Sequence, residues 1–143
     1  MRKRLERQDV IRRVVRRERI RTQRELVERL QSLGFVCTQA TVSRDITEMG
    51  LRKLPEGVYV LAEDLHLQRM ISELVTKVTQ ADSMVIVKAS PGTAPGVAAA
   101  LDGAGLEDIL GSIAGDDTIL VITKSTADAT AVVDTIDKYR GRR

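Results

Sequence analysis

Two adjacent carboxylates, Asp116 and Asp117, follow Gly115 between two β-prone runs, and Asp102 precedes them near the end of a predicted helix. Neighbouring carboxylates repel each other and destabilise a fold unless a cation is shared between them. The pair has three interpretations. It is a polar turn in which Gly and Asp satisfy local backbone geometry, a metal site with three or more converging ligands, or a site for a guanidinium, whose planar fork takes bidentate hydrogen bonds from carboxylates.

Metal chemistry has little support elsewhere in the sequence. No His or Glu lies at a spacing that would complete a metal site around the Asp pair. The single histidine, His66, has no Cys or carboxylate companions at ligand spacing, so we expect it at the surface. A metal-dependent hydrolase built on the pair also lacks a general base and a nucleophile–base constellation. The sequence therefore predicts neither a metal site nor an enzyme.

The segment 38–49 carries the second informative pattern. On a helix, Val42, Ile46 and Met49 fall on one face. The opposite face presents an arginine among small polar and methyl-bearing side chains, which suits hydrogen bonds to base edges and contact with thymine methyl groups in a major groove. A purely structural helix more often carries Glu and Lys there. We therefore predict a helix-turn-helix that contacts double-stranded DNA through Gln39, Ala40, Ser43, Arg44 and Thr47.

The helices that must position these residues follow from caps and apolar spacing. Segment 5–17 carries a stripe of aliphatic residues, and a capping box at Thr22 predicts the start of a second helix. Gly34 is a suitable end for that helix. Thr38 then predicts the start of the recognition helix, and Gly50 its end.

A hairpin is predicted directly after the recognition helix. The β-prone runs 51–54 and 58–61 are joined by a Pro-Glu-Gly turn at 55–57. Three helices followed by a hairpin is the winged helix-turn-helix plan. Arg52 and Lys53 lie on this hairpin, where a wing would contact phosphates or a minor groove; a simple solvated strand is the alternative.

The C-terminal part predicts an α+β domain, so the whole chain belongs to the mixed α/β class. Apolar residues repeat with helical spacing from Leu67 to Val78 and predict one amphipathic helix. After it we expect strands at 84–89, 109–114 and 118–123, a helix capped by Thr93, and a final helix at 126–140. The order α-β-α-β-β-α places a sheet against helices. Because so small a domain has a thin core, oligomerisation is a natural way to bury more apolar surface.

The net charge of +3 conceals a strong asymmetry. Residues 1–61 carry 15 Lys+Arg against 8 Asp+Glu, a balance of +7, whereas residues 62–143 carry 8 against 12, a balance of −4. The basic half suits a polyphosphate partner. We predict a DNA-binding domain at 1–62, a linker at 63–66 and an oligomerisation domain at 67–143.

Composition limits the remaining function classes. Apolar residues make up 43% and charged residues 30%, which is ordinary for a globular protein, and no apolar run is long enough to span a bilayer. The single cysteine, Cys37, excludes an internal disulfide and is most simply a small residue in the turn before Thr38. Its isolation fits a reducing cytoplasm.

Three motifs, in this order and spacing, resemble the bacterial arginine repressor family. They are Thr38-Gln39-Ala40-Thr41-Val42-Ser43-Arg44-Asp45-Ile46, Pro91-Gly92-Thr93-Ala94, and Leu110-Gly111-Ser112-Ile113-Ala114-Gly115-Asp116-Asp117-Thr118-Ile119. The resemblance is collinear over nearly the whole chain. It implies an N-terminal winged helix-turn-helix and a C-terminal domain that forms trimers stacked into hexamers. It also implies L-arginine as a corepressor bound between trimers, with no other cofactor.

The resemblance also assigns residues. The family's serine-arginine pair in the recognition helix falls on Ser43 and Arg44, and its aspartate pair falls on Asp116 and Asp117, with Asp102 as the aspartate that closes the preceding helix. Members often carry a polar side chain where this chain has Pro95. That departure removes a side-chain contact to the ligand or to a neighbouring subunit, and it leaves the Asp pair intact.

Two functions follow from the resemblance. The leading one is an arginine-sensing transcriptional regulator that represses biosynthetic genes, with activation of catabolic genes as a further role. The alternative is an architectural DNA-binding protein whose hexamer wraps or synapses DNA in site-specific recombination. Operator sites near arginine genes would favour the first, and a recombination site would favour the second.

Overall fold

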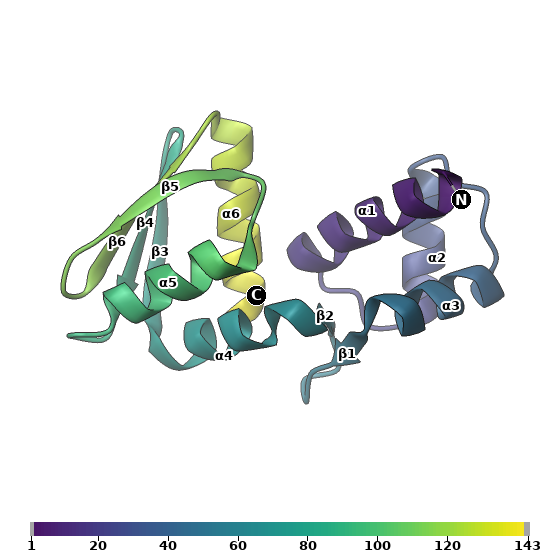
Figure 1. Ribbon diagram of the computed structural model, residues 1–143, viewed down its shortest axis with the longest axis horizontal. Helices are drawn as coiled ribbons and strands as arrows, with labels where there is room; N and C mark the ends of the chain where they lie inside the picture. The colour runs from purple at the N-terminus through teal and green to yellow at the C-terminus, as the bar shows by residue number, and fades with distance from the viewer. Residues whose placement is uncertain (1, 142–143) are drawn as a thin grey trace. The chain divides into compact units, whose positions relative to one another are not determined.

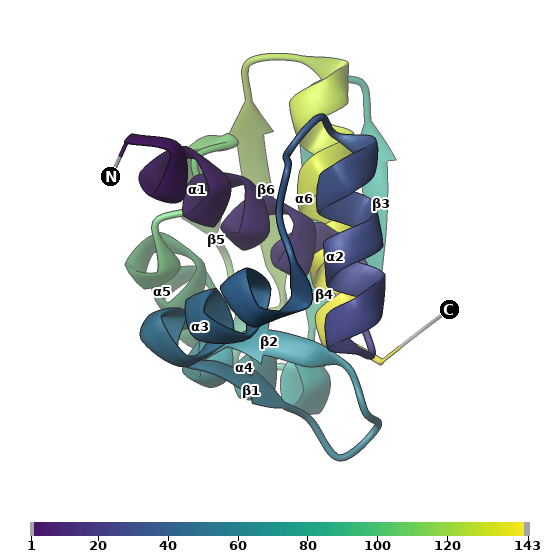
Figure 2. The same ribbon diagram turned by 90° about the vertical axis from the view of Figure 1, so that its right-hand side faces the viewer.

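Three helices and a hairpin form residues 1–62, the first of two units into which the chain divides. The computed structural model describes residues 2–141. In the first unit, α1 (Arg2–Arg17), α2 (Gln23–Ser32) and α3 (Gln39–Met49) precede the antiparallel strands β1 (Leu51–Lys53) and β2 (Tyr59–Leu61). Figure 2 shows the loop that joins β1 and β2 projecting beyond the helices, whereas β2 itself contacts α1. The predicted winged helix-turn-helix plan is confirmed, with α1 beginning three residues earlier than expected.

The ends of α2 and α3 are set by their caps. The Thr22 hydroxyl accepts a hydrogen bond from the Glu25 amide at 3.0 Å, and the Thr38 hydroxyl accepts one from the Thr41 amide at 3.3 Å. These bonds satisfy backbone donors that a helix start leaves free. Gly50 ends α3 with φ +67°, a left-handed conformation that favours glycine.

The core of the first unit is aliphatic. Each of the three helices contributes fully buried side chains: Ile11 and Val15 from α1, Leu26 and Leu30 from α2, and Val42 from α3. Because the three helices share one core, the orientation of α3 depends on α1 and α2 as much as on its own sequence.

The second unit, residues 63–143, is a sheet packed against helices. The turn η1 (Ala62–Asp64) leads into α4 (Leu65–Leu74), followed by β3 (Val75–Ala81), β4 (Met84–Ala89), α5 (Ala94–Ala104), β5 (Ile109–Ala114), β6 (Thr118–Thr123) and α6 (Thr126–Tyr139). The four strands are antiparallel in the order β3-β4-β6-β5. Helices α5 and α6 both contact the sheet, and α4 packs against both of them (Figure 1).

One prediction about local structure is wrong. The helix expected to continue to Val78 ends at Leu74, and the next seven residues form β3. The apolar spacing of Val75 and Val78 is compatible with both a helix and a strand. The strand forms because β-branched residues favour it and because β4 offers an edge to pair with.

The segment 63–66, which the sequence predicts to be a linker, has regular structure. These residues form the end of η1 and the start of α4, and Asp64 is fully buried. The Asp64 carboxylate accepts a hydrogen bond from the Tyr139 hydroxyl at 2.6 Å. This long-range hydrogen bond ties the segment to α6.

The sheet has one covered and one open face. Val85, Val87, Ile119 and Val121 alternate along β4 and β6 and are fully buried under the helices. The residues between them point to the open face, as the strand period of two requires. There, Met84 is paired with Ile122, and Ile86 and Ile113 both flank Leu120 across the ladder. Met84, Ile113 and Ile122 are exposed, and Ile86 and Leu120 are half-buried.

Candidate DNA-contacting surface and ligand site

The outer face of α3 carries the predicted DNA-contacting side chains. Gln39, Ala40, Arg44 and Thr47 are exposed, and Ser43 is half-buried. The Thr47 hydroxyl donates to the Ser43 carbonyl at 3.2 Å, which turns it along the helix. Arg44 has no hydrogen bond or ion pair with any other described residue. Its five donors therefore remain available for an external acceptor.

The residue after Arg44 has the opposite environment. The Asp45 side chain is only 2% exposed and forms a forked ion pair with Arg7 of α1, whose side chain is 13% exposed. Burial alone raises the pKa of a carboxyl, but here the hydrogen bonds from Arg7 and Gln8 outweigh it and hold the pKa of Asp45 below its ordinary value. The same bond raises the pKa of Arg7. Asp45 is therefore ionised and fixed to α1.

Further polar contacts extend this junction between α1 and α3. The Gln8 amide donates to Asp45 at 3.0 Å and to Glu48 at 2.9 Å, and Arg4 lies 3.7 Å from Glu48. Sequence analysis assigned no role to these residues. The signal was present, because Asp45 falls on the same helical face as Val42 and Met49, where a charge requires a partner.

The hairpin residues Arg52 and Lys53 are both exposed on β1. The Lys53 ammonium lies 5.3 Å from the centre of the Tyr59 ring across the hairpin. This cation–π contact restrains Lys53. The structure thus places both cations at exposed positions on the strand of the wing that directly follows α3 in sequence.

The Asp pair occupies the turn between β5 and β6. The Asp117 carbonyl accepts the Ala89 amide at 2.8 Å, and the Asp116 carbonyl accepts the Ala94 amide at 3.1 Å. These bonds tie the turn to the end of β4 and to the first residue of α5. The turn is therefore a fixed element of the fold, and both carboxylates project from an anchored backbone.

The two carboxylates differ in their partners. The Thr118 hydroxyl donates to Asp117 at 2.8 Å, and Lys88 donates to the Thr118 hydroxyl at 2.8 Å while lying 3.7 Å from Asp117. The bond from Thr118 and then the charge of Lys88 hold the pKa of Asp117 below its ordinary value. Asp116 is exposed, and its side chain has no partner among residues 2–141.

Asp102 does not join the pair within one chain. The pair is anchored to the N-terminal end of α5, and Asp102 lies eight residues further along that helix, a distance of about 12 Å at the α-helical rise. Asp102 is exposed and accepts a bond from Ser112 of β5 at 3.3 Å. Sequence reasoning grouped the three carboxylates as one site; the structure brings only Asp116 and Asp117 together.

Three other expectations from the sequence concern Pro95, a metal site and Cys37. Pro95 is exposed in the first turn of α5, one residue beyond the amide that bonds to Asp116. Among residues 2–141, no group of three His, Cys, Asp or Glu side chains is arranged to hold a metal ion. Cys37 is buried, and this burial raises the pKa of its thiol.

Comparison with known proteins covers both units. Residues 1–67 match the family model for the arginine repressor DNA binding domain, and residues 71–138 match the model for the arginine repressor C-terminal domain. The chain belongs to the arginine repressor family. Membership makes it an arginine-responsive, DNA-binding regulator of transcription.

Curated relatives match over most of their length. An arginine repressor of Thermus thermophilus is 45% identical over 140 residues, which cover 90% of this chain and 85% of the relative. One from Carboxydothermus hydrogenoformans is 38% identical over 146 residues, covering 94% and 97%. One from Caldicellulosiruptor bescii is 43% identical over 141 residues, covering 92% and 93%.

Proposed function

We propose that this arginine repressor family member binds operator DNA when L-arginine occupies a site made by two copies of the chain, and that it represses arginine biosynthesis genes. Two exposed charged groups support this assignment. Arg44 in the first unit and Asp116 in the second have no partner among the described residues, although their neighbours Asp45 and Asp117 do. An unpaired arginine suits a guanine edge, and an unpaired carboxylate suits a guanidinium.

The DNA-contacting role is assigned to the outer face of α3. Arg44 would donate to a base edge, Ser43 and Thr47 would contact bases or phosphates, and Gln39 and Ala40 would complete the surface. Arg52 and Lys53 would approach the backbone from the wing. The first unit's balance of +7 supports the same role, because neutralised phosphates release counterions.

The ligand-binding role is assigned to Asp102, Asp116 and Asp117 of different copies. Asp102 lies about 12 Å along α5 from Ala94, the residue that anchors the pair, so within one copy the three carboxylates do not converge on a single group. A second copy can supply Asp102 beside the Asp pair of the first. The guanidinium would bind the pair, and Asp102 would take the ligand's amino group.

Self-association has independent support from the open face of the sheet. Met84, Ile86, Ile113, Leu120 and Ile122 form one apolar surface across β4, β6 and β5. Contiguous exposed apolar surfaces of this kind mark interfaces. A second copy would cover this face, and we propose the trimer and hexamer implied by the family as the assembly.

Two further points belong to the proposal. We assign the chain to the cytoplasm, and we assign it a binding function rather than a catalytic one. Separately, no helix in the part of the chain that the structure describes has the length and hydropathy to cross a bilayer. Recombination support remains the alternative DNA-binding role. Footprints that fall on promoters of arginine genes would separate regulation from it.

The ligand is tested by calorimetric titration of the full chain with L-arginine, citrulline, ornithine and lysine. The proposal expects binding of arginine alone, because citrulline lacks the charge and the two amines lack the planar fork. Equal binding of lysine or ornithine would overturn the guanidinium assignment.

The shared site is tested by mixing variants. Asp102→Asn and Asp117→Asn each remove one half of the site, so each variant alone should bind arginine weakly. Unfolding the two together and refolding them should restore a fraction of the sites, because a wild-type Asp102 then meets a wild-type Asp pair from another copy. A mixture that binds no better than either variant would show that the site lies within one chain.

A further inference from the structure

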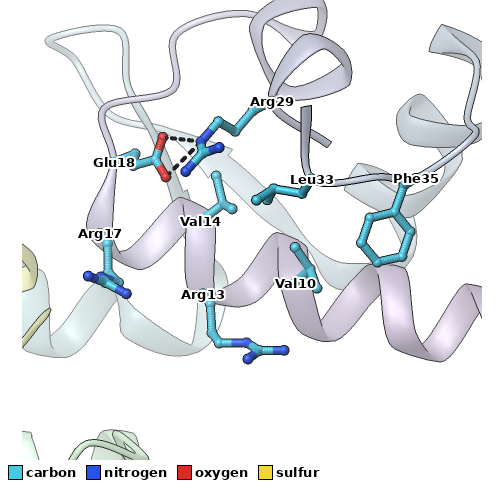
Figure 3. Close-up of a pocket in the computed structure, with 8 residues that line it drawn as sticks. All are labelled: Val10, Arg13, Val14, Arg17, Glu18, Arg29, Leu33 and Phe35. Carbon is cyan, nitrogen blue, oxygen red and sulfur yellow. Dashed lines mark hydrogen bonds and ion pairs between the residues drawn. The ribbon is translucent and has the colours of Figure 1, made fainter. Parts of the chain in front are cut away.

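A groove in the first unit has no role in the proposed DNA contacts or ligand site. It has a volume of about 330 Å³ and lies between α1 and the end of α2. Its lining residues are Val10, Arg13, Val14, Arg17, Glu18, Arg29, Leu33 and Phe35 (Figure 3). No described residue of α3 or of the wing lines the groove.

The floor of the groove is apolar. Val10 and Val14 lie one turn apart on α1, and Leu33 and Phe35 flank the turn at Gly34. Gly34 has φ +95°, and the Phe35 amide bonds to the Leu30 carbonyl, so the chain folds back and directs Leu33 and Phe35 to the same groove (Figure 3). Leu33 is nevertheless 45% exposed, and Phe35, the one phenylalanine of the chain, is half-buried.

The rim of the groove is basic. The Arg29 guanidinium donates to both Glu18 oxygens at 2.9 and 3.0 Å, and that pair borders one side (Figure 3). Arg13 and Arg17 border the other side, one helical turn apart, and neither has a hydrogen-bond or ion-pair partner among the described residues. The rim therefore offers two unpaired cations beside exposed apolar surface.

This combination identifies the chemistry of an occupant. A DNA phosphate would satisfy the arginines but has no surface to cover Leu33 and Phe35. A protein helix with carboxylates at i and i+4 and a large apolar side chain on the same face satisfies both, since helix-in-groove recognition uses that spacing. We propose that the groove is a docking site for an acidic amphipathic helix of a partner protein.

In this arrangement an apolar anchor of the partner lies between Val10, Val14 and Leu33. Its carboxylates pair with Arg13 and Arg17. Because α3 and the wing do not line the groove, the regulator holds this partner while its recognition helix is on DNA. The groove thus gives the DNA-bound protein a means of recruiting a second protein.

The probe is a fluorescein-labelled helical peptide with Glu at i and i+4 and leucines on the same face, titrated into the full-length protein. Leu33→Gln should weaken its binding by roughly tenfold or more, the scale of a buried interface anchor. Arg13→Glu/Arg17→Glu should weaken it further. The matched control is Arg21→Glu/Arg24→Glu, an equal charge change at exposed positions outside the groove, which should have the smaller effect.

A peptide with alanines in place of the leucines should bind wild-type protein weakly. Leu33→Gln should leave the affinity for a random DNA duplex and the sedimentation profile unchanged. Equal peptide affinity for Leu33→Gln and wild type would overturn the proposal, as would equal losses in the two double variants. Displacement of the peptide by the duplex would assign the groove to DNA, and an altered assembly in Leu33→Gln would assign it to a second copy; both results also overturn the proposal.

Discussion

Each unit places two neighbouring charged residues in contrasting environments. In α3, Arg44 is exposed and unpartnered while Asp45 is buried and held by Arg7. In the β5–β6 turn, Asp116 is exposed and unpartnered while Asp117 is held by Thr118 and Lys88. One residue of each pair faces outward, and its neighbour anchors to the same unit.

The two anchors differ in strength. The Asp45–Arg7 pair is nearly excluded from water and joins two helices, whereas Asp117 and Lys88 are 47% and 45% exposed. Solvent weakens the second pair. Under the proposed assignments, the DNA-contacting surface is therefore complete within one chain. The proposed ligand site is not, because it needs Asp102 from a second copy as well as the Asp pair.

The largest expected effect is that of Arg44→Ala on specific operator binding, which tests whether α3 carries the DNA-contacting surface. A bidentate arginine contact contributes about 1–3 kcal/mol of discrimination per base pair. Because the proposed assembly would present several copies to one operator, specific binding should be lost. Assembly and arginine binding should remain. The measurement is a gel shift with operator and random DNA, with Arg24→Ala as the control. Wild-type operator affinity in Arg44→Ala would disprove the placement of the recognition surface.

The next largest effect is expected on the stability of the first unit when the Asp45–Arg7 ion pair is removed. Asp45→Ala leaves Arg7 buried without a partner, which typically costs about 3–5 kcal/mol. We expect the first unit to unfold at lower urea concentration while the second unit is unchanged. Asp45→Asn should cost less, because an amide still bonds to Gln8. Similar unfolding of Asp45→Ala and wild type would show that the pair contributes little.

The pH dependence of the same unit has a definite sign. The folded-state pKa of Asp45 is lowered, so the pair's contribution to stability is present above the unfolded-state value, about 3.9, and is lost as the pH falls through the lower folded-state value. Acid unfolding of wild type should therefore be steeper in this range than that of Asp45→Asn.

Sequence periodicity predicted most elements of the molecule, including β4, β5 and β6 at their observed bounds. It failed at β3, because the spacing of Val75 and Val78 is compatible with both a helix and a strand. The segment is a strand because it pairs with β4. Local patterns also located Arg44 and the Asp pair. They could not reveal that Arg7 reaches Asp45, or that the pair is anchored at Ala94, eight residues before Asp102 on α5, because these relations depend on tertiary structure.

A smaller effect is expected when the second anchor is changed. Asp117→Asn removes one charged acceptor and should weaken arginine binding by at least about tenfold, since bonds to charged groups are the stronger ones. It should leave the stability of both units intact. Because the substitution also removes carboxylate repulsion between copies, the assembly should persist without arginine and no longer respond to it.

Calorimetry and sedimentation with and without arginine test this expectation. Asp82→Asn is the control, because it makes the same charge change at an exposed turn on the same sheet. Unchanged arginine affinity in Asp117→Asn would mean that the Asp pair is only a polar turn.

The smallest effects are expected from substitutions of one helix N-cap in each unit, because each cap stabilises only the unit that contains it. Thr38 caps α3, and Ser125 caps α6 by accepting the Asp128 amide at 3.1 Å. Replacing either with Ala should cost about 1 kcal/mol in the unit that contains it. Only Thr38→Ala should also reduce operator affinity, by a few-fold, because fraying of the first turn of α3 moves Gln39 and Ala40. Operator titrations of the two variants at equal stability loss measure this difference. If Ser125→Ala weakens operator binding as much as Thr38→Ala, the DNA-contacting surface is not complete within the first unit and depends on the second.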